Sequence, residues 1–253
     1  MRTRLLSLCA LAALGTAWAG PAPVESDLLK TLKPGTSEKK PWELTLAAGT
    51  ALNSGNSDTR LSSASAIYEY KGKVHELLFS ADTAYGTDKG SANVDNSNGK
   101  ADYHFRFSKY TYALADATGA RDGIADLQYR FIVSPGLGFY AVKNEDMSLG
   151  FEAGPGFLTE RKGGEDDNAW TGRVAERGEW QALATSKIWE SVEYVPHLDD
   201  FEQYLITAEA GVQSAVTTLL NVRLVVKDTY DNLPAPGRKS NDVSIMGALA
   251  IKL

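Results

Sequence analysis

The chain has 253 residues and a formal net charge of −6, with 43% hydrophobic and 23% charged residues. The length allows one β-barrel or two ordinary domains. The sequence pI of about 5.2 argues against a nucleic-acid partner, because no basic stripe is present to neutralise phosphates. The ordinary apolar content argues against intrinsic disorder.

The first nineteen residues are organised like an export signal. Arg2 and Arg4 form a positive region, Leu5–Trp18 is an apolar stretch, and Ala17–Ala19 is an A-x-A cleavage site. We therefore interpret residues 1–19 as a signal peptide. Its cleavage would remove two Arg, no acidic residue and the single Cys, which changes the net charge from −6 to −8. The exported chain would then lack any thiol for a disulfide, a metal site or a nucleophile.

Residues 20–41 contain Pro, Lys and Ser and predict a periplasmic N-terminal tail. From Trp42 onward the hydrophobic period changes to two, which is typical of half-buried strands. No later segment is long and apolar enough to predict a membrane-spanning helix. We expect about twelve strands, at residues 42–53, 60–71, 74–86, 98–108, 110–117, 125–141, 147–160, 172–184, 188–196, 201–213, 218–230 and 242–253.

The clearest strand is Lys100–Lys109, where apolar and charged residues alternate strictly. The same alternation returns after Asp126, after Met147 and in the last strand up to Leu253. Two segments have a weaker pattern. The Ser/Ala run in 60–71 leaves the face ambiguous, and in 172–184 Glu176 shares a face with apolar residues, so either it lies near a rim or the expected register is wrong.

The predicted connections alternate between short and longer along the chain. Segments such as Gly72–Lys73 and Thr185–Lys187 are short, whereas Thr87–Ser97, Arg161–Thr171 and Asp231–Asn241 are long and polar. An up-and-down barrel with tight turns at one rim and larger loops at the other gives this alternation. A sandwich with Greek-key crossings does not require it. The predicted fold is therefore all-β, a single up-and-down antiparallel barrel of about twelve strands.

Alternation alone does not decide which face points outward, since a membrane barrel inverts the pattern of a soluble one. Three features favour the membrane barrel over an exported soluble β-protein. Mixed charges lie at mid-strand, as in a narrow lumen. Tyr and Trp gather near strand ends, as in two interfacial girdles. Alternating apolar residues continue to Leu253, as in outer-membrane assembly signals.

This orientation gives two sets of candidate residues. The lumen-lining candidates are charged residues on the polar faces of the strands, namely Lys100, Asp102, His104, Arg106, Asp126, Arg130, Glu209, Arg223 and Lys227. The lipid-facing candidates are the apolar residues on the opposite faces, namely Tyr103, Phe105, Phe107, Leu127, Tyr129, Phe131, Leu220, Leu224, Leu249 and Leu253. The lumen set is interpreted either as a salt-bridged plug that closes the barrel or as the lining of a narrow pore. Twelve strands enclose little free width, which favours the plug.

No sequence pattern predicts catalysis. The three histidines, His75, His104 and His197, lack H-x-x-x-H and H-E-x-x-H spacing, and no G-x-S-x-G elbow occurs. A lipid-hydrolysing enzyme would need Ser and His on adjacent strands, both facing lipid. The acidic run Glu165–Asp167 is most simply a solvated loop, since EF-hand spacing is absent. We expect no catalytic, cofactor or metal residues.

Several segments resemble one family. Ser54–Thr59 follows a strand that begins at Trp42, and the match extends over about 42–253. Further matching segments are Leu127–Arg130, Gly136–Tyr140, Glu152–Phe157 and Tyr230–Pro234 with Asp242 after it. The chain thus resembles the salt-induced outer-membrane protein family, a YdiY-like family of unknown function. The resemblance implies an outer-membrane barrel and supplies no catalytic residues.

The sequence therefore predicts a Gram-negative outer-membrane protein that contacts outer-membrane lipid and lipopolysaccharide, and contacts the barrel-assembly machinery during biogenesis. The leading interpretation is a structural role or a role in envelope stress. A narrow channel for small polar solutes is the second interpretation, and a lipid-modifying enzyme the third. The sequence leaves the physiological role and the oligomeric state open.

Overall fold

A computed structural model of the chain describes residues 41–53 and 59–253. The signal peptide and almost all of the tail expected at 20–41 lie outside these residues, as do Ser54–Asp58 of the family motif. The described residues form twelve strands: β1 (Trp42–Asn53), β2 (Thr59–Lys71), β3 (His75–Asp88), β4 (Ser91–Arg106), β5 (Thr111–Asp122), β6 (Leu127–Lys143), β7 (Met147–Lys162), β8 (Glu165–Leu183), β9 (Ser186–Pro196), β10 (Tyr204–Ala215), β11 (Leu220–Asp231) and β12 (Asn241–Lys252). No helix in this part of the chain is long and apolar enough to cross a membrane.

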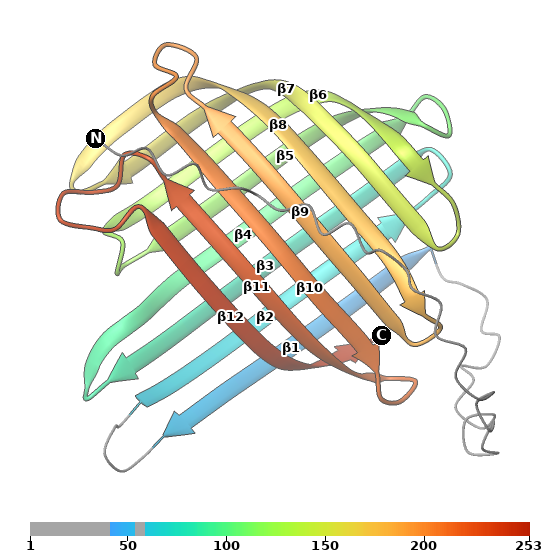
Figure 1. Ribbon diagram of the computed structural model, residues 1–253, viewed down its shortest axis with the longest axis horizontal. Coiled ribbons are helices and arrows are strands. Elements are labelled where there is room, and N and C mark those ends of the chain that lie inside the picture. Colours follow the sequence, from blue (N-terminus) through green and yellow to red (C-terminus); the bar gives the residue numbers. More distant parts are fainter. Residues whose placement is uncertain (1–40, 54–58) are drawn as a thin grey trace, which may run out of the picture. The chain divides into compact units, whose positions relative to one another are not determined.

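The twelve strands form one closed antiparallel barrel, which confirms the predicted fold class (Figure 1). Each strand pairs with its sequence neighbour, and β12 closes the ring on β1 through pairs such as Leu46 with Ile251. Closure gives every strand a paired neighbour on each side, although β1 and β12 pair only over Thr45–Ala48 and Leu249–Lys252. We call the end where β1 begins and β12 finishes the terminal end, and the opposite end the loop end.

Apolar side chains lie on the outside of this barrel. Phe105 and Leu224 are 38% and 46% exposed, while their strand neighbours Arg106 and Arg223 point inward, toward Glu76 and Trp189. Other large exposed apolar residues alternate with buried ones along β6, β11 and β12. The outer surface of a soluble β-barrel is normally polar, so this distribution is the one that an apolar solvent requires.

The predictions of long loops at Thr87–Ser97 and Arg161–Thr171 are wrong. The structure continues β3 and β4 to the two-residue turn Lys89–Gly90, and β7 and β8 to Gly163–Gly164. All four turn residues have positive φ, between 48° and 84°, as type I′ hairpin turns demand. The Asn, Ser and Asp residues of 91–97 suggested a loop because of their composition. Backbone pairing needs no apolar side chains, so these polar segments continue the sheet as hairpins.

Candidate functional site

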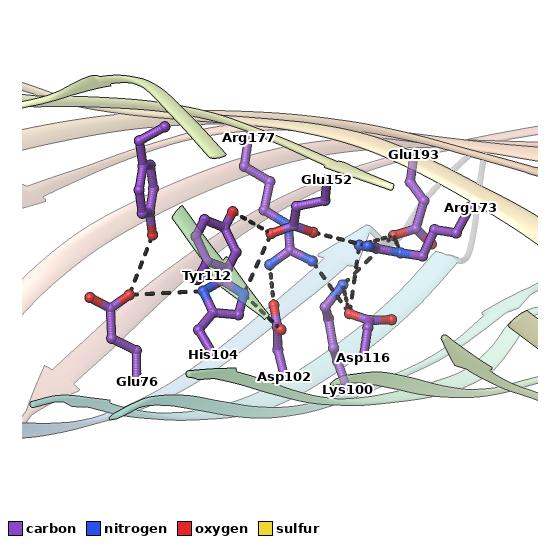
Figure 2. A network of polar contacts seen from close by, with 11 residues as sticks. Glu76, Lys100, Asp102, His104, Tyr112, Asp116, Glu152, Arg173, Arg177 and Glu193 are labelled. Atoms are coloured by element: carbon purple, nitrogen blue, oxygen red, sulfur yellow. Dashed lines mark hydrogen bonds and ion pairs between the residues drawn. The ribbon is translucent and has the colours of Figure 1, made fainter. Parts of the chain in front are cut away.

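A network of charged and polar side chains lies inside the barrel. We call the ten residues labelled in Figure 2 the central network: Glu76, Lys100, Asp102, His104, Tyr112, Asp116, Glu152, Arg173, Arg177 and Glu193. They come from the inward-facing positions of six strands, β3, β4, β5, β7, β8 and β9. Within β4 and β8 they are spaced at even intervals, because alternate residues of a strand share a face.

The ion pairs of this network cross the interior. Arg177 on β8 contacts Asp102 on β4, and three strands separate these two in the ring. Arg173 Nη2 on β8 lies 3.7 Å from Asp116 Oδ2 on β5, and Lys100 Nζ on β4 lies 3.9 Å from Glu193 Oε2 on β9. Side chains of strands that are not neighbours in a closed barrel can meet only through the lumen. The network therefore spans the lumen at mid-height.

The members of the network are deeply buried. The side chains of Arg173, Glu152 and Asp116 are 1%, 1% and 2% exposed. Burying isolated charges is costly, so each ion needs several close partners. Arg173 has three: Nη1 lies 2.9 Å from Glu152, and Nη2 lies 2.7 Å from Glu193 and 3.7 Å from Asp116. Lys100 Nζ adds a 2.8 Å contact to Asp116.

His104 lies among three carboxylates. Its Nε2 is 3.0 Å from Asp102 Oδ1 and 3.4 Å from Glu152 Oε1, and its Nδ1 is 3.8 Å from Glu76 Oε2. Its ring stacks on Tyr112 with 4.3 Å between centroids, and Tyr112 donates a hydrogen bond of 3.0 Å to Glu152 Oε1. The imidazole is thus fixed by contacts on its face and at both nitrogens.

Space for the Tyr112 ring is provided by a glycine. A Cβ added at Gly138 would lie 2.5 Å from Tyr112 Cε2, well inside van der Waals contact. Gly138 pairs directly with Tyr112 across β5 and β6. The Gly-rich segment of β6 therefore serves the packing of the lumen, because its missing side chain gives the phenol its position against His104 and Glu152.

The lumen is also crossed above and below the central network. Toward the loop end, the inward residues Ile132, Leu158, Val195 and Leu205 form a buried apolar cluster. Beyond it lies the loop-end cluster, in which Arg130 contacts Glu160 and Asp231, and Lys162 Nζ lies 3.0 Å from both carboxylates. At the terminal end, Lys71 on β2 lies 3.7 Å from Glu179 on β8, directly across the ring.

The connection between β11 and β12, residues 232–240, folds against the loop-end cluster. Lys162 donates a 2.6 Å hydrogen bond to the carbonyl of Leu233, and Ala235 is buried. Pro236 and Ala235 lie over the Gly163 turn, where an added Cβ would be 3.1 Å from Pro236 Cδ. This loop, which the sequence correctly predicted to be long, therefore covers the β7–β8 side of the loop end.

A second lumen wall carries a smaller polar group. Trp189 on β9 donates a 2.8 Å hydrogen bond to Glu209 on β10, and the Arg223 guanidinium lies 4.7 Å above the Trp189 ring. Within residues 41–53 and 59–253, neither Arg223 nor Lys227 has a carboxylate within 4.0 Å. Their charges are thus uncompensated by direct contact, unlike those of the central network.

The structure distributes the predicted lumen residues over these groups. Lys100, Asp102 and His104 belong to the central network, and Arg106 adjoins it through a 3.2 Å contact with Glu76. Arg130 lies in the loop-end cluster. The second wall holds Glu209 and Arg223, with Lys227 paired in register opposite Glu209. Asp126 is a correction: it lies in the turn between β5 and β6, with φ 57°, because β6 begins at Leu127.

Among the predicted lipid-facing residues, Leu127 is also a correction. It is only 7% exposed, because an irregularity in pairing between Leu127 and Tyr129 reverses the alternation at the start of β6. Phe107 is exposed but lies in the turn after β4 rather than in a strand. The others lie on outward positions of their strands, namely Tyr103, Phe105, Tyr129, Phe131, Leu220, Leu224 and Leu249, with Leu253 exposed just beyond β12.

Sequence reasoning missed much of the central network. Arg173 and Arg177 lie in the segment whose register was ambiguous, and their cross-lumen partners are set by closure of the ring. The pattern that could have identified them is the alternation in β8. Arg173, Arg177 and Glu179 occupy one face of the strand, and the exposed Val174 and Trp180 occupy the other. Glu176 is part of that outward set, partly exposed and paired with Phe151 and Val192.

Comparison with solved structures finds barrels of similar extent. The NanC porin aligns with a TM-score of 0.47 and 8% identity, covering 83% of this chain and 97% of that one. The KdgM porin gives 0.42 and 11%, covering 83% and 96%. The translocator domain of the autotransporter NalP from Neisseria meningitidis gives 0.46 and 12%, covering 89% and 93%.

A search among curated proteins for similar sequences gave no match. The family comparison is decisive by contrast, because it covers nearly the whole barrel, including the segments that form the central network. The family model for "Protein of unknown function, DUF481" matches residues 46–252, and the chain belongs to that family.

Proposed function

We propose that this protein is an outer-membrane barrel that is closed at rest, with a structural role in the envelope. The observation that carries the closed state is the pairing, through the lumen, of Arg173 and Arg177 on β8 with Asp116 on β5 and Asp102 on β4, three and four strands away around the ring. Residues 1–19 would direct export, and 20–41 would form a periplasmic tail. Outer-membrane lipid and lipopolysaccharide would contact the exposed apolar face, and the barrel-assembly machinery would insert it.

Location is tested by cell fractionation. We expect the protein in the detergent-extracted outer membrane, with a heat-modifiable mobility on gels, because a closed barrel resists unfolding by detergent without boiling. Recovery in the soluble periplasmic extract would contradict the proposal.

The closed state is tested by conductance in planar bilayers. We expect no single-channel steps from the wild-type chain. The double variant Asp116→Ala/Arg173→Ala removes one cation and one anion from the crossing, so the net charge is unchanged while the barrier loses two side chains. This variant should conduct.

The matched control is Asp95→Ala/Arg121→Ala, which removes a bidentate pair between β4 and β5 with contacts of 2.7 and 2.9 Å. Both residues lie toward the loop end and are substantially exposed, with 32% and 51% of their side chains accessible. This control variant should show no single-channel steps. Steps from the wild type, or equal conductance from both variants, would overturn the closed state.

A narrow passage for small polar solutes is the second candidate. It is favoured by Arg223 and Lys227, which face the lumen from β11 without an ion-pair partner among the described residues. Wild-type conductance that prefers anions, and loses this preference in Arg223→Ala/Lys227→Ala, would establish it in place of the closed barrel.

We also propose that the protein does not hydrolyse lipids. His75 is a histidine of the outer face, and its Nδ1 lies 2.8 Å from the hydroxyl of Tyr103. The hydroxyl that contacts this histidine is thus a phenol, whereas a serine esterase pairs its histidine with a serine hydroxyl. Release of fatty acid from phospholipid or lipid A by the wild-type protein, and not by His75→Ala, would contradict this.

A further inference from the structure

Three side chains of the central network direct their donor atoms at one another. One donor atom each of Asp102, His104 and Glu152 lies within 4.8 Å of the other two, and His104 Nε2 is 3.0 Å from Asp102 Oδ1 and 3.4 Å from Glu152 Oε1. Ligand atoms around a tetrahedral ion with bonds of about 2.0–2.1 Å are separated by about 3.3 Å. The three atoms are therefore spaced as ligands of one small ion would be.

The remaining oxygens of the two carboxylates are held by arginines. Asp102 Oδ2 contacts Arg177, and Glu152 Oε2 accepts a 2.9 Å hydrogen bond from Arg173. The other nitrogen of His104 faces Glu76 Oε2 at 3.8 Å. Metal-binding histidines commonly present their second nitrogen to a carboxylate, and metal-binding carboxylates are hydrogen-bonded in turn. The surroundings of the triad thus resemble the outer shell of a metal site.

Two of these donor atoms lack an aligned hydrogen bond. Asp102 is 96% buried, and its Oδ1 has no hydrogen-bond partner of acceptable geometry; the same holds for His104 Nε2. Buried polar atoms normally have a partner, and these two lie 3.0 Å apart without the geometry of a hydrogen bond to each other. An ion bound to both would satisfy them. The neighbouring Tyr112 hydroxyl is already used by Glu152.

Carboxylates are concentrated around the imidazole. Glu76, Asp102 and Glu152 each place an oxygen within 3.8 Å of a His104 nitrogen. Arg106, Arg177 and Arg173 contact the other oxygen of these carboxylates. Among the described residues, the oxygens that face His104 therefore have no arginine contact, and a cation between them would be attracted by three nearby anions.

We propose that Asp102, His104 and Glu152 bind one divalent transition-metal ion of the zinc type. One nitrogen and two carboxylate oxygens suit zinc, cobalt or nickel better than calcium or magnesium, which prefer all-oxygen sites. The ion takes the position that a proton on His104 Nε2 would otherwise occupy. Water would supply the fourth ligand from the side of His104, whose side chain is 12% exposed against 3% for Asp102 and 1% for Glu152.

The test uses the full chain, purified without a polyhistidine tag and folded in detergent. Equilibrium dialysis against Zn²⁺ with elemental quantification should give one ion per chain, and binding should weaken as the pH falls because protons compete for the ligands. Co²⁺ in its place should give the visible absorption bands of a low-coordinate site. His104→Ala should abolish both signals.

The matched control is His75→Ala, which removes a histidine from the outer face and should bind one ion like the wild type. Heat-modifiable mobility verifies that each variant has folded. Glu76→Gln keeps all three ligands and should weaken binding by about 10- to 100-fold, as loss of an outer-shell partner does. A wild-type chain that binds no Zn²⁺, or a His104→Ala chain that binds as well as wild type, would overturn the proposal and leave His104 as a protonated member of the ion-pair network.

Discussion

At the scale of single residues, the interior of this barrel depends on Arg173. It contacts three carboxylates on three other strands, Asp116, Glu152 and Glu193, and its side chain is almost completely inaccessible. A sequence-based analysis can place such an ion on the inward face of β8. It cannot identify all the partners, because Asp116 lies 57 residues away along the chain, on a strand that does not pair with β8, and meets Arg173 only when the sheet curls into a barrel.

Arg173→Met should be strongly destabilising. The substitution keeps an unbranched chain of similar length but leaves three buried carboxylates short of a cation, which costs about 3–5 kcal/mol for a broken buried pair. Denaturant titration of the folded chain in detergent or vesicles measures the change. Arg121→Met, at the exposed pair with Asp95, should have little effect; equal losses from both variants would mean that burial contributes nothing.

Gly138→Ala tests whether the missing side chain of this glycine makes room for the Tyr112 ring. The added Cβ would overlap the phenol ring, so the ring or β6 must move, and overpacking of this kind costs about 1–3 kcal/mol. Gly247→Ala on β12 is the matched control, because its Cβ would meet nothing within 4 Å. If the two alanine variants unfold at the same denaturant concentration, the glycine does not serve the packing of Tyr112.

At the scale of elements, strands with strict alternation were predictable and polar ones were not. In β6 and β12 the two faces differ clearly in exposure along most of the strand. Their predicted first and last residues differ from those in the structure by at most two positions. The halves of β4 and β8 nearest the loop end carry Asn or Asp on both faces, so their composition suggested loops. Leu127 was misplaced because a local irregularity in pairing cannot be read from periodicity.

The outer face of β8 contains one charge among apolar neighbours. Glu176 lies between Val174 and Trp180, which are 56% and 52% exposed. In the proposed membrane location this carboxylate faces acyl chains. Glu176→Leu should therefore stabilise the barrel by about 1–2 kcal/mol in phospholipid vesicles, since charges on the lipid face are unfavourable.

The matched control for Glu176→Leu is Glu165→Leu at the start of β8, on the polar hairpin near the loop end. It should give no gain. A Glu176 variant that folds less readily in vesicles than the wild type would show that this carboxylate contacts something other than lipid, and would question the orientation of β8.

At the scale of the whole molecule, the lumen is crossed by an ionic layer, an apolar layer and a second ionic layer from mid-height to the loop end. Family and fold class followed from the sequence because they depend on alternation and short motifs. The strand number also favoured a plugged lumen over a narrow pore, but it did not identify which side chains meet inside the barrel, because strand number sets only an upper limit on its width.

Replacing residues 233–239 by an Asn-Gly turn tests which layer closes the barrel. The exchange removes Ala235 and Pro236 from the loop end but leaves the central network intact. Planar-bilayer recordings should therefore stay silent, in contrast to Asp116→Ala/Arg173→Ala. Conductance from the shortened loop would assign closure to residues 232–240 rather than to the interior.

The pairing of ions from opposite walls has a consequence for biogenesis. Arg130 and Asp231 are 101 positions apart, and Lys71 and Glu179 meet only from facing sides of the finished cylinder. In the proposed outer-membrane location, a half-inserted and still open sheet would present these groups without their partners. Pairing of β1 with β12 and neutralisation of the interior would therefore occur together. Substitution of these interior ions should then slow the final, ring-closing step of insertion as well as destabilise the finished barrel.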